Sequence, residues 1–248
     1  MASTLKPKKN RRSEPREPKG PKGKALQRLI ENDLIRKVSY DEYRDKVQRV
    51  YGGPKGALLS VASMLSMHIA LGERIFRSRR FDLRGAKDVL DVGSGAGQLA
   101  SHILKYGDPD ASLTCTDLSR QMLRRARNRL KSGRPRFVSC DLSQLPFKEA
   151  SFDCITCGYV LEHLPNPEPG LAEMSRVLRR GGRMFLLTTE DNFSGAWTSR
   201  LWYCRTYNRA DLRRLCEQLG LHWKQEIWFT RMHKAMRAGG ICVEIEKR

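Results

Sequence analysis

The sequence predicts an α/β fold, in which helices cover both faces of a seven-stranded and mostly parallel sheet. Three observations support this prediction. Beyond residue 80, short apolar runs typical of strands alternate with segments of helical periodicity. The first run leads into a glycine-rich turn and then a helix, as in a βαβ unit. The chain has 248 residues, 40% of them hydrophobic, which is enough for one large core.

The strands and helices are expected in a regular order along the chain. The strand-like runs cover 86–92, 112–117, 135–140, 152–158, 183–190, 224–230 and 241–246. Helices are expected near 96–106, 119–132, 168–179 and 209–219. Ser119 is the expected N-cap of the second helix, Asn166-Pro167 opens the third, and Gly181-Gly182 closes it. The last two strands are joined by "RMHKAMRAGG", which is too short for an ordinary helical crossover, so we expect an antiparallel last strand.

The N-terminal third differs from the rest in composition. Residues 1–24 hold nine Lys or Arg against two acidic residues, with almost no large apolar side chain, so we expect a disordered basic tail. Apolar residues at helical spacing predict extra N-terminal helices within 25–80, among them an apolar one over 57–76, and we expect them to act as a lid. Residues 81–248 form the predicted α/β domain.

Composition also bounds the location and the partners. No apolar run reaches the roughly 20 residues of a membrane-spanning helix, and the N-terminus lacks a signal-peptide pattern. Seven cysteines without framework spacing suit a reducing compartment, so we expect a cytoplasmic protein. The net charge of +20 predicts weak, non-specific attraction to RNA or to an anionic membrane surface.

The stretch "VLDVGSGAGQLA", residues 89–100, is the most informative motif. Gly93, Gly95 and Gly97 are spaced G-x-G-x-G, whereas the dinucleotide fingerprint is G-x-G-x-x-G. Asp91 precedes the turn, where a carboxylate would repel a pyrophosphate. S-adenosylmethionine has a sulfonium, an ammonium and no phosphate, so an acidic neighbour favours it. The turn therefore indicates S-adenosylmethionine as the cofactor.

Two further acidic residues follow the next two predicted strands. Asp117 in "LTCTDLS" is placed to accept both ribose hydroxyls of a nucleoside. Asp141 in "FVSCDLSQLPF" is placed to accept from the adenine amino group, and the Leu142 N–H to donate to a ring nitrogen. Carboxyl ends of neighbouring parallel strands meet at one edge of a sheet, where open α/β folds bind ligands.

These motifs, with "SFDCITCGYVLEHLPNPEPGLAEMSRVLRRGGRMFLL" and "TYNRADLRRLCEQLGL", resemble the class I S-adenosylmethionine-dependent methyltransferases. The similarity is greatest to the ubiquinone/menaquinone-biosynthesis (type 11) group. It implies a Rossmann-like fold with an antiparallel last strand of seven. It also implies that the glycine turn, with Ser94 at a variable position, surrounds the methionine moiety. The further implied cofactor contacts are Asp117, Asp141, the adenine-packing Leu118 and Leu142, and Cys157 and Gly158 near the reacting methyl group.

Two short motifs, one in a loop and one on a strand, contain residues that could take part in chemistry. His163 in "LEHLP" is the candidate catalytic base, although it can equally be a packed loop residue, and a methyl transfer to an enolate or phenolate needs no base. Glu162 is expected to be exposed or to cap a helix. Cys154 and Cys157 lie three apart on a strand and so point to opposite faces, and we expect no metal site.

The acceptor pocket is expected beside the aromatic segment 191–207, which follows the fifth strand. An aromatic lid over a flat or lipidic acceptor competes there with a plain helix packed on the sheet. The expected pocket residues are Tyr43, Trp197, Trp202 and Tyr203.

The predicted function is methyl transfer by in-line displacement to a small, fairly apolar acceptor such as a quinone precursor, a phenol or a lipid. One alternative is an RNA or protein methyltransferase, favoured by the helix "RQMLRRARNRL", which has five arginines and no acid. The other is a non-catalytic cofactor-binding or nucleic-acid-associated scaffold.

Overall fold

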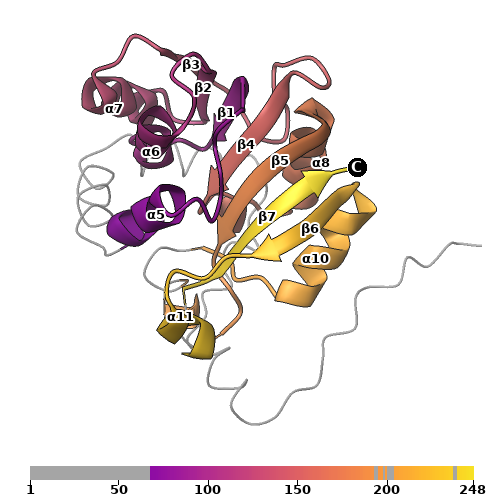
Figure 1. The fold of residues 1–248 in the computed structure, drawn as a ribbon. Helices are drawn as coiled ribbons and strands as arrows, with labels where there is room; N and C mark the ends of the chain where they lie inside the picture. Colours follow the sequence, from indigo (N-terminus) through magenta and orange to yellow (C-terminus); the bar gives the residue numbers. More distant parts are fainter. Residues whose placement is uncertain (1–67, 193–194, 198, 200–203, 237–238) are drawn as a thin grey trace, which may run out of the picture.

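Seven strands form one sheet in the order β3-β2-β1-β4-β5-β7-β6 (Figure 1). The computed structural model describes residues 68–248, except 193–194, 198, 200–203 and 237–238. β1, β2, β3, β4 and β5 pair in parallel, and β7 runs antiparallel to both β5 and β6, which confirms the predicted fold class. The strands are β1 Asp88–Val92, β2 Ser112–Asp117, β3 Pro135–Ser139, β4 Phe152–Gly158, β5 Leu178–Thr188, β6 Leu221–Glu226 and β7 Ile241–Lys247.

Helices connect the strands at the positions that local sequence signals favour. Ser119 caps the helix that follows β2, because its Oγ accepts a 3.3 Å hydrogen bond from the Met122 N–H. Pro167 precedes the helix that follows β4, and a six-residue helix lies in the short β6–β7 connection. The helical elements are α5 His68–Arg77, α6 Gln98–Tyr106, α7 Arg120–Leu130, η1 Leu161–His163, α8 Glu168–Val177, α10 Arg209–Gln218 and α11 Arg231–Met236.

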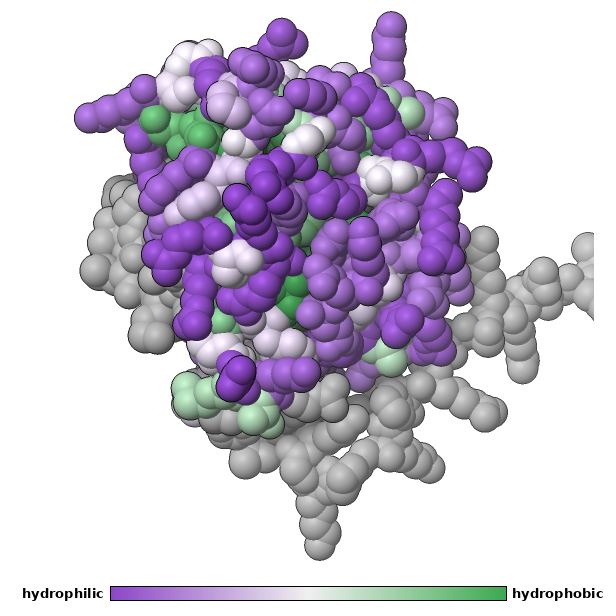
Figure 2. Space-filling view, viewed as in Figure 1, coloured by the Kyte–Doolittle hydropathy of each residue, from purple (hydrophilic) through white to green (hydrophobic). Residues whose placement is uncertain are grey.

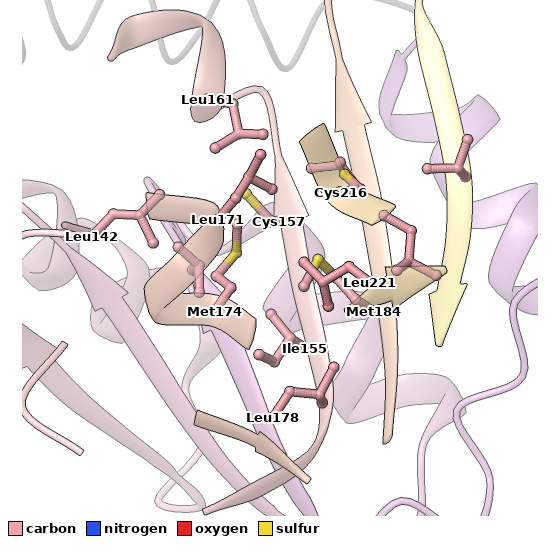
Figure 3. Packing of buried hydrophobic residues seen from close by; sticks show 14 of the residues in the cluster. Leu142, Ile155, Cys157, Leu161, Leu171, Met174, Leu178, Met184, Cys216 and Leu221 are labelled. Carbon is pink, nitrogen blue, oxygen red and sulfur yellow. The ribbon is translucent and has the colours of Figure 1, made fainter. Parts of the chain in front are cut away.

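The strand alternation divides the core into two hydrophobic clusters, one on each face of the sheet. Ile155 and Cys157 of β4 join the cluster beneath α8 and α10, part of which is drawn in Figure 3. Cys154, the residue before Ile155, points to the opposite face and joins the cluster beneath α5 and α6. The two cysteines therefore face opposite sides of the sheet, as the period-two pattern predicts.

Two element boundaries differ from those the sequence predicts. β5 begins at Leu178, so the pair Gly181-Gly182 lies inside the strand rather than closing a helix that ends at Val177. A Cβ on Gly182 would come within 2.7 Å of the Arg179 carbonyl oxygen, so this backbone path needs glycine. The register between β4 and β5 shifts at this point, between Phe152 and Cys154.

The sixth strand is also displaced from its predicted position. It occupies Leu221–Glu226 rather than 224–230, because pairing with β7 starts at Leu221. Ile227 and Phe229, which suggested a strand, are buried instead in the cluster beneath α5 and α6. The apolar residues at 227 and 229 therefore reflect burial in the core and not membership of a strand.

The expected tail (1–24) and most of the expected N-terminal helices (25–80) lie outside the described residues, apart from α5, which overlaps the end of the predicted 57–76 helix and extends one residue beyond it. None of the helices in the described part of the chain combines the length and the apolarity that a bilayer crossing requires.

Candidate active site

The turn between β1 and α6 is held in a conformation that requires glycine. Gly93, Gly95 and Gly97 have φ values of 61°, 52° and 80°, all in the left-handed region. A Cβ on Gly93 would lie 2.2 Å from Cγ2 of Val160, so this glycine also permits a close packing contact. A Cβ on Gly95 would have Cε of Met122 as its nearest neighbour, at 3.6 Å. The turn is thus closely packed at its first glycine and more open at its second.

Asp91 is fully buried in β1 next to this turn. Its Oδ1 accepts a 2.6 Å hydrogen bond from Oγ1 of Thr156, which lies opposite it in β4. Its Oδ2 is buried and has no hydrogen-bond partner among the described residues. Burial raises the pKa of Asp91 to about 6. The sequence shows Thr156 as a hydroxyl residue within an otherwise apolar strand. Its hydrogen bond to Asp91 could not be predicted, because it depends on β4 lying beside β1.

Asp117, at the carboxyl end of β2, connects the turn to the start of α7. Its Oδ2 accepts a 2.9 Å bond from the Gly95 N–H and its Oδ1 a 2.8 Å bond from the Ser119 N–H. Burial raises the pKa of Asp117. Each carboxylate oxygen has a second lone pair, so this side chain keeps capacity to accept hydroxyl donors. Ser94 shapes the same turn, since its Oγ donates to the Asp91 carbonyl oxygen at 2.9 Å.

The residues expected around the adenine follow β2 and β3. Asp141 comes after β3, and its Oδ1 accepts from both the backbone N–H (2.8 Å) and the Oγ (2.7 Å) of Ser143. Leu118 is partly exposed, whereas Leu142 is buried in the cluster beneath α8. The structure therefore brings Asp117 and Asp141 to the same sheet edge, because Asp117 pairs in register with Ser139 of β3.

Cys157 and Gly158 end β4 at that same edge. The Cys157 side chain lies within the core near Leu171 and Met174 (Figure 3), and burial raises the pKa of its thiol well above the ordinary value. A Cβ on Gly158 would come within 2.8 Å of Cδ1 of Leu99, at the start of α6. The cysteine side chain is thus part of the core, and the glycine permits close packing of α6 against β4.

Glu162 is buried, which contradicts the expectation that it is exposed or caps a helix. Only 1% of its surface is exposed, and its two carboxylate oxygens each accept a 2.8 Å hydrogen bond, from Oγ1 of Thr188 and Oγ1 of Thr189. Burial raises its pKa to about 7. These contacts join the turn after β4 to the end of β5. No local pattern predicts them, because the two threonines are more than 25 positions further along the chain.

The loop that holds Glu162 also contains Tyr159 and His163. Tyr159 adopts φ 57° and donates its N–H to the Leu187 carbonyl oxygen at 2.7 Å. The left-handed conformation is rare for an aromatic residue and fixes a sharp turn directly after β4. His163 is partly buried, and this burial lowers its pKa to about 4. At neutral pH the imidazole is therefore uncharged and a weak base.

Of the expected acceptor-pocket residues, only Trp197 lies among those described. It follows β5, and 56% of its surface is exposed. Tyr43, Trp202 and Tyr203 lie outside the described residues. Within the described ranges, no group of His, Cys, Asp or Glu side chains has the arrangement of a metal site.

This donor set fits S-adenosylmethionine better than a phosphate-bearing cofactor. The buried, unpartnered Oδ2 of Asp91 suits an ammonium group and would repel a phosphate. The carboxylates of Asp117 and Asp141 are acceptors at consecutive strand ends, where hydroxyl and amino donors of an adenosine can be met.

Comparison with known proteins supports the same assignment. Residues 90–186 match the family Methyltransf_11, a methyltransferase domain. The chain is similar to the ubiquinone/menaquinone biosynthesis C-methyltransferase of Pseudomonas fluorescens (strain SBW25), with 28% identity over 180 residues that make up 65% of this chain and 70% of that protein. The enzyme of the same description from Cupriavidus metallidurans is 32% identical over 126 residues, 50% of each protein, so the match spans half the length of that relative.

Among solved structures, the fold is similar to that of geranyl diphosphate C-methyltransferase from Streptomyces coelicolor A3(2), which was determined with S-adenosyl-L-homocysteine. The TM-score is 0.57 at 13% identity, covering 72% of this chain and 78% of that one, and so shows the fold alone. With the family match over 90–186, the strand order and the acidic sheet edge, these findings support a class I S-adenosylmethionine-dependent methyltransferase of the type 11 group, an enzyme whose cofactor is S-adenosylmethionine.

Proposed function

We propose that three carboxylates at successive strand ends position S-adenosylmethionine. Asp91 faces the ammonium of the methionine moiety, Asp117 accepts from the ribose hydroxyls, and Asp141 accepts from the adenine amino group. The single observation that carries this proposal is the fully buried Asp91, one of whose carboxylate oxygens has no hydrogen-bond partner among the described residues. A buried carboxylate oxygen is costly unless a donor or a cation meets it. We also propose that the turn of Gly93, Ser94, Gly95 and Gly97 surrounds the methionine moiety, that Leu118 and Leu142 pack against the adenine, and that Cys157 and Gly158 lie near the reacting methyl group.

We further propose that the acceptor is small and fairly apolar, such as a quinone precursor, a phenol or a lipid. Trp197 supports this, because its indole, nine residues after the end of β5, is 56% exposed and offers an apolar surface. The names of the related enzymes support it as well, since both are described as C-methyltransferases of ubiquinone and menaquinone biosynthesis. We expect Tyr43, Trp202 and Tyr203 to complete this pocket.

The bound cofactor supplies an electrophilic methyl group for an in-line displacement. The protein's part is then to hold the acceptor in line and to exclude water, which can supply most of the rate. His163, the candidate base, has a pKa of about 4 and would abstract a proton poorly at neutral pH. We therefore assign proton loss to the acceptor's own ionisation and to His163 a contact with the acceptor or the loop.

The test is transfer of a tritium-labelled methyl group from S-adenosylmethionine to a panel of hydroquinones, phenols and isoprenoid lipids. The proposal predicts label in the organic extract for at least one acceptor. It also predicts loss of this label in Asp117→Ala but not in Asp110→Ala, a matched change in the turn before β2, at the opposite edge of the sheet. A wild-type protein that binds S-adenosylhomocysteine but labels nothing in the panel would contradict the proposed acceptor class.

RNA or protein acceptors give a different result in the same assay. Label would then appear in the macromolecular fraction of a cell extract. For an RNA acceptor, its yield would fall steeply as salt rises from about 50 to about 200 mM. That outcome would replace the small apolar acceptor with the macromolecular one.

A further inference from the structure

The exposed face of α7 has a line of positive charge that runs the length of the helix. Arg120, Arg124, Arg127 and Lys131 are all exposed and are separated by four, three and four positions. This spacing places Arg120, Arg124 and Arg127 on one face of α7, and Lys131 is the C-cap residue directly after the helix. With a rise of about 1.5 Å per residue, the four cations extend over about 16 Å. We call these four residues the α7 stripe.

None of the four stripe residues forms an ion pair with a carboxylate of the described residues. Several other exposed cations of the domain are paired with carboxylates. Arg84 pairs with Asp82, Lys87 with Asp108, and both Arg213 and Arg214 pair with acids of α10. The α7 stripe is therefore a row of cations that no carboxylate of the described residues neutralises.

This arrangement is unfavourable for the isolated helix. Like charges three or four positions apart repel one another, and α7 has no acidic residue in its first turn to match the positive end of the helix dipole. Arg127 also stacks over Phe137, with its guanidinium 5.1 Å from the ring centroid, so one cation is held in place on the surface. A polyanion laid along the stripe would relieve the repulsion.

The chemistry of the stripe favours phosphodiesters over a lipid surface. A helix that binds a membrane places apolar side chains toward the bilayer. Here Met122, Leu123 and Ala126 are buried against the domain, while the exposed positions between the cations are Gln121 and Asn128. Arginine, which provides three of the four charges, recognises phosphate through its planar fork of donors. Hydrophilic residues also cover most of the face shown in Figure 2.

We propose that the α7 stripe binds the phosphate backbone of a nucleic acid. The helix that carries the stripe, α7, packs against β2 and β3, at the end of the sheet away from β6 and α10 (Figure 1). This proposal is independent of the methyl acceptor, because a nucleic acid held there need not enter the active site. No aromatic side chain lies among the stripe residues, so the contact is with phosphates and carries no base sequence preference.

The experiment compares three forms of the full chain in fluorescence anisotropy with a labelled 20-base-pair RNA duplex. The first is the wild type. The second is the stripe variant, with Arg120, Arg124, Arg127 and Lys131 all changed to Gln. The third is a matched control, with Arg84, Lys87, Arg213 and Arg214 changed to Gln, which removes the same charge from paired positions. All eight side chains are exposed, and binding of S-adenosylhomocysteine checks that each variant is folded.

The stripe variant is expected to bind RNA at least tenfold more weakly, and the slope of log K against log salt to fall by about three to four. The control is expected to stay within about twofold of the wild type. Equal RNA binding by the stripe variant and the wild type would overturn the proposal. It would also be overturned if the stripe variant bound RNA normally but lost binding to vesicles containing phosphatidylglycerol, since the surface would then serve lipid headgroups. An equal loss in the control would show that only net charge matters, and would overturn it too.

Discussion

The hydroxyl of Thr156 donates a 2.6 Å hydrogen bond to Oδ1 of Asp91 across the β1–β4 pair, while Oδ2 of the same buried carboxylate has no partner in the described part of the chain. Thr156 orients the carboxylate and leaves one oxygen for a ligand. This arrangement explains why an acidic residue can precede the glycine turn at the carboxyl edge of the sheet. It also makes cofactor binding dependent on the charge of Asp91.

The affinity for S-adenosylhomocysteine should depend on pH through Asp91. Its pKa of about 6 means that the carboxyl group is neutral in acid, where it cannot attract an ammonium. Affinity should therefore be constant above about pH 7 and fall about tenfold by pH 5. Calorimetric titration across pH 5–8 measures this. Asp91→Asn should bind more weakly with a flat profile, and a variant that keeps the wild-type pH dependence would exclude Asp91 as the titrating group.

Gly93→Ala should destabilise the protein more than Gly95→Ala. Both positions have positive φ, which costs about 1–2 kcal/mol for a residue with a Cβ. At Gly93 the new Cβ would also lie 2.2 Å from Cγ2 of Val160, whereas at Gly95 the nearest atom is 3.6 Å away. Thermal unfolding compares the two variants. The double variant Gly93→Ala/Val160→Ala should recover part of the loss, and no recovery would show that the Val160 contact is not the cause.

Glu162→Gln should change how stability depends on pH. The folded protein holds the Glu162 proton up to about pH 7, while an ordinary glutamate releases it near 4.5, so the wild type loses stability as pH rises between these values. The loss is about 3 kcal/mol, from a pKa raised from 4.5 to about 7. The variant lacks this titration, so its unfolding free energy should decline less from pH 5 to pH 8. If the unfolding free energies of the variant and the wild type differed by the same amount at pH 5 and pH 8, Glu162 would not be the group that titrates.

The strand ends of the site could be predicted from the sequence, and its contacts across the sheet could not. Asp91, Asp117 and Asp141 stand out because each follows a recognisable apolar run. The bond from Thr156 depends instead on β4 lying beside β1, and the burial of Glu162 on two threonines at the end of β5. Both are pairings between distant parts of the chain. Local patterns also misplaced β6, where Ile227 and Phe229 are apolar because they fill the core.

The most direct test of the cofactor site is calorimetric titration of the full chain with S-adenosylhomocysteine, and with NAD as a control ligand. The account predicts that only S-adenosylhomocysteine binds. Asp117→Ala should weaken this binding about a hundredfold or more, since two hydrogen bonds to a charged acceptor contribute about 1.5–3 kcal/mol each. Asp110→Ala should bind as the wild type does. Binding of NAD, or unchanged affinity for S-adenosylhomocysteine in Asp117→Ala, would contradict the assignment of this sheet edge as the S-adenosylmethionine site.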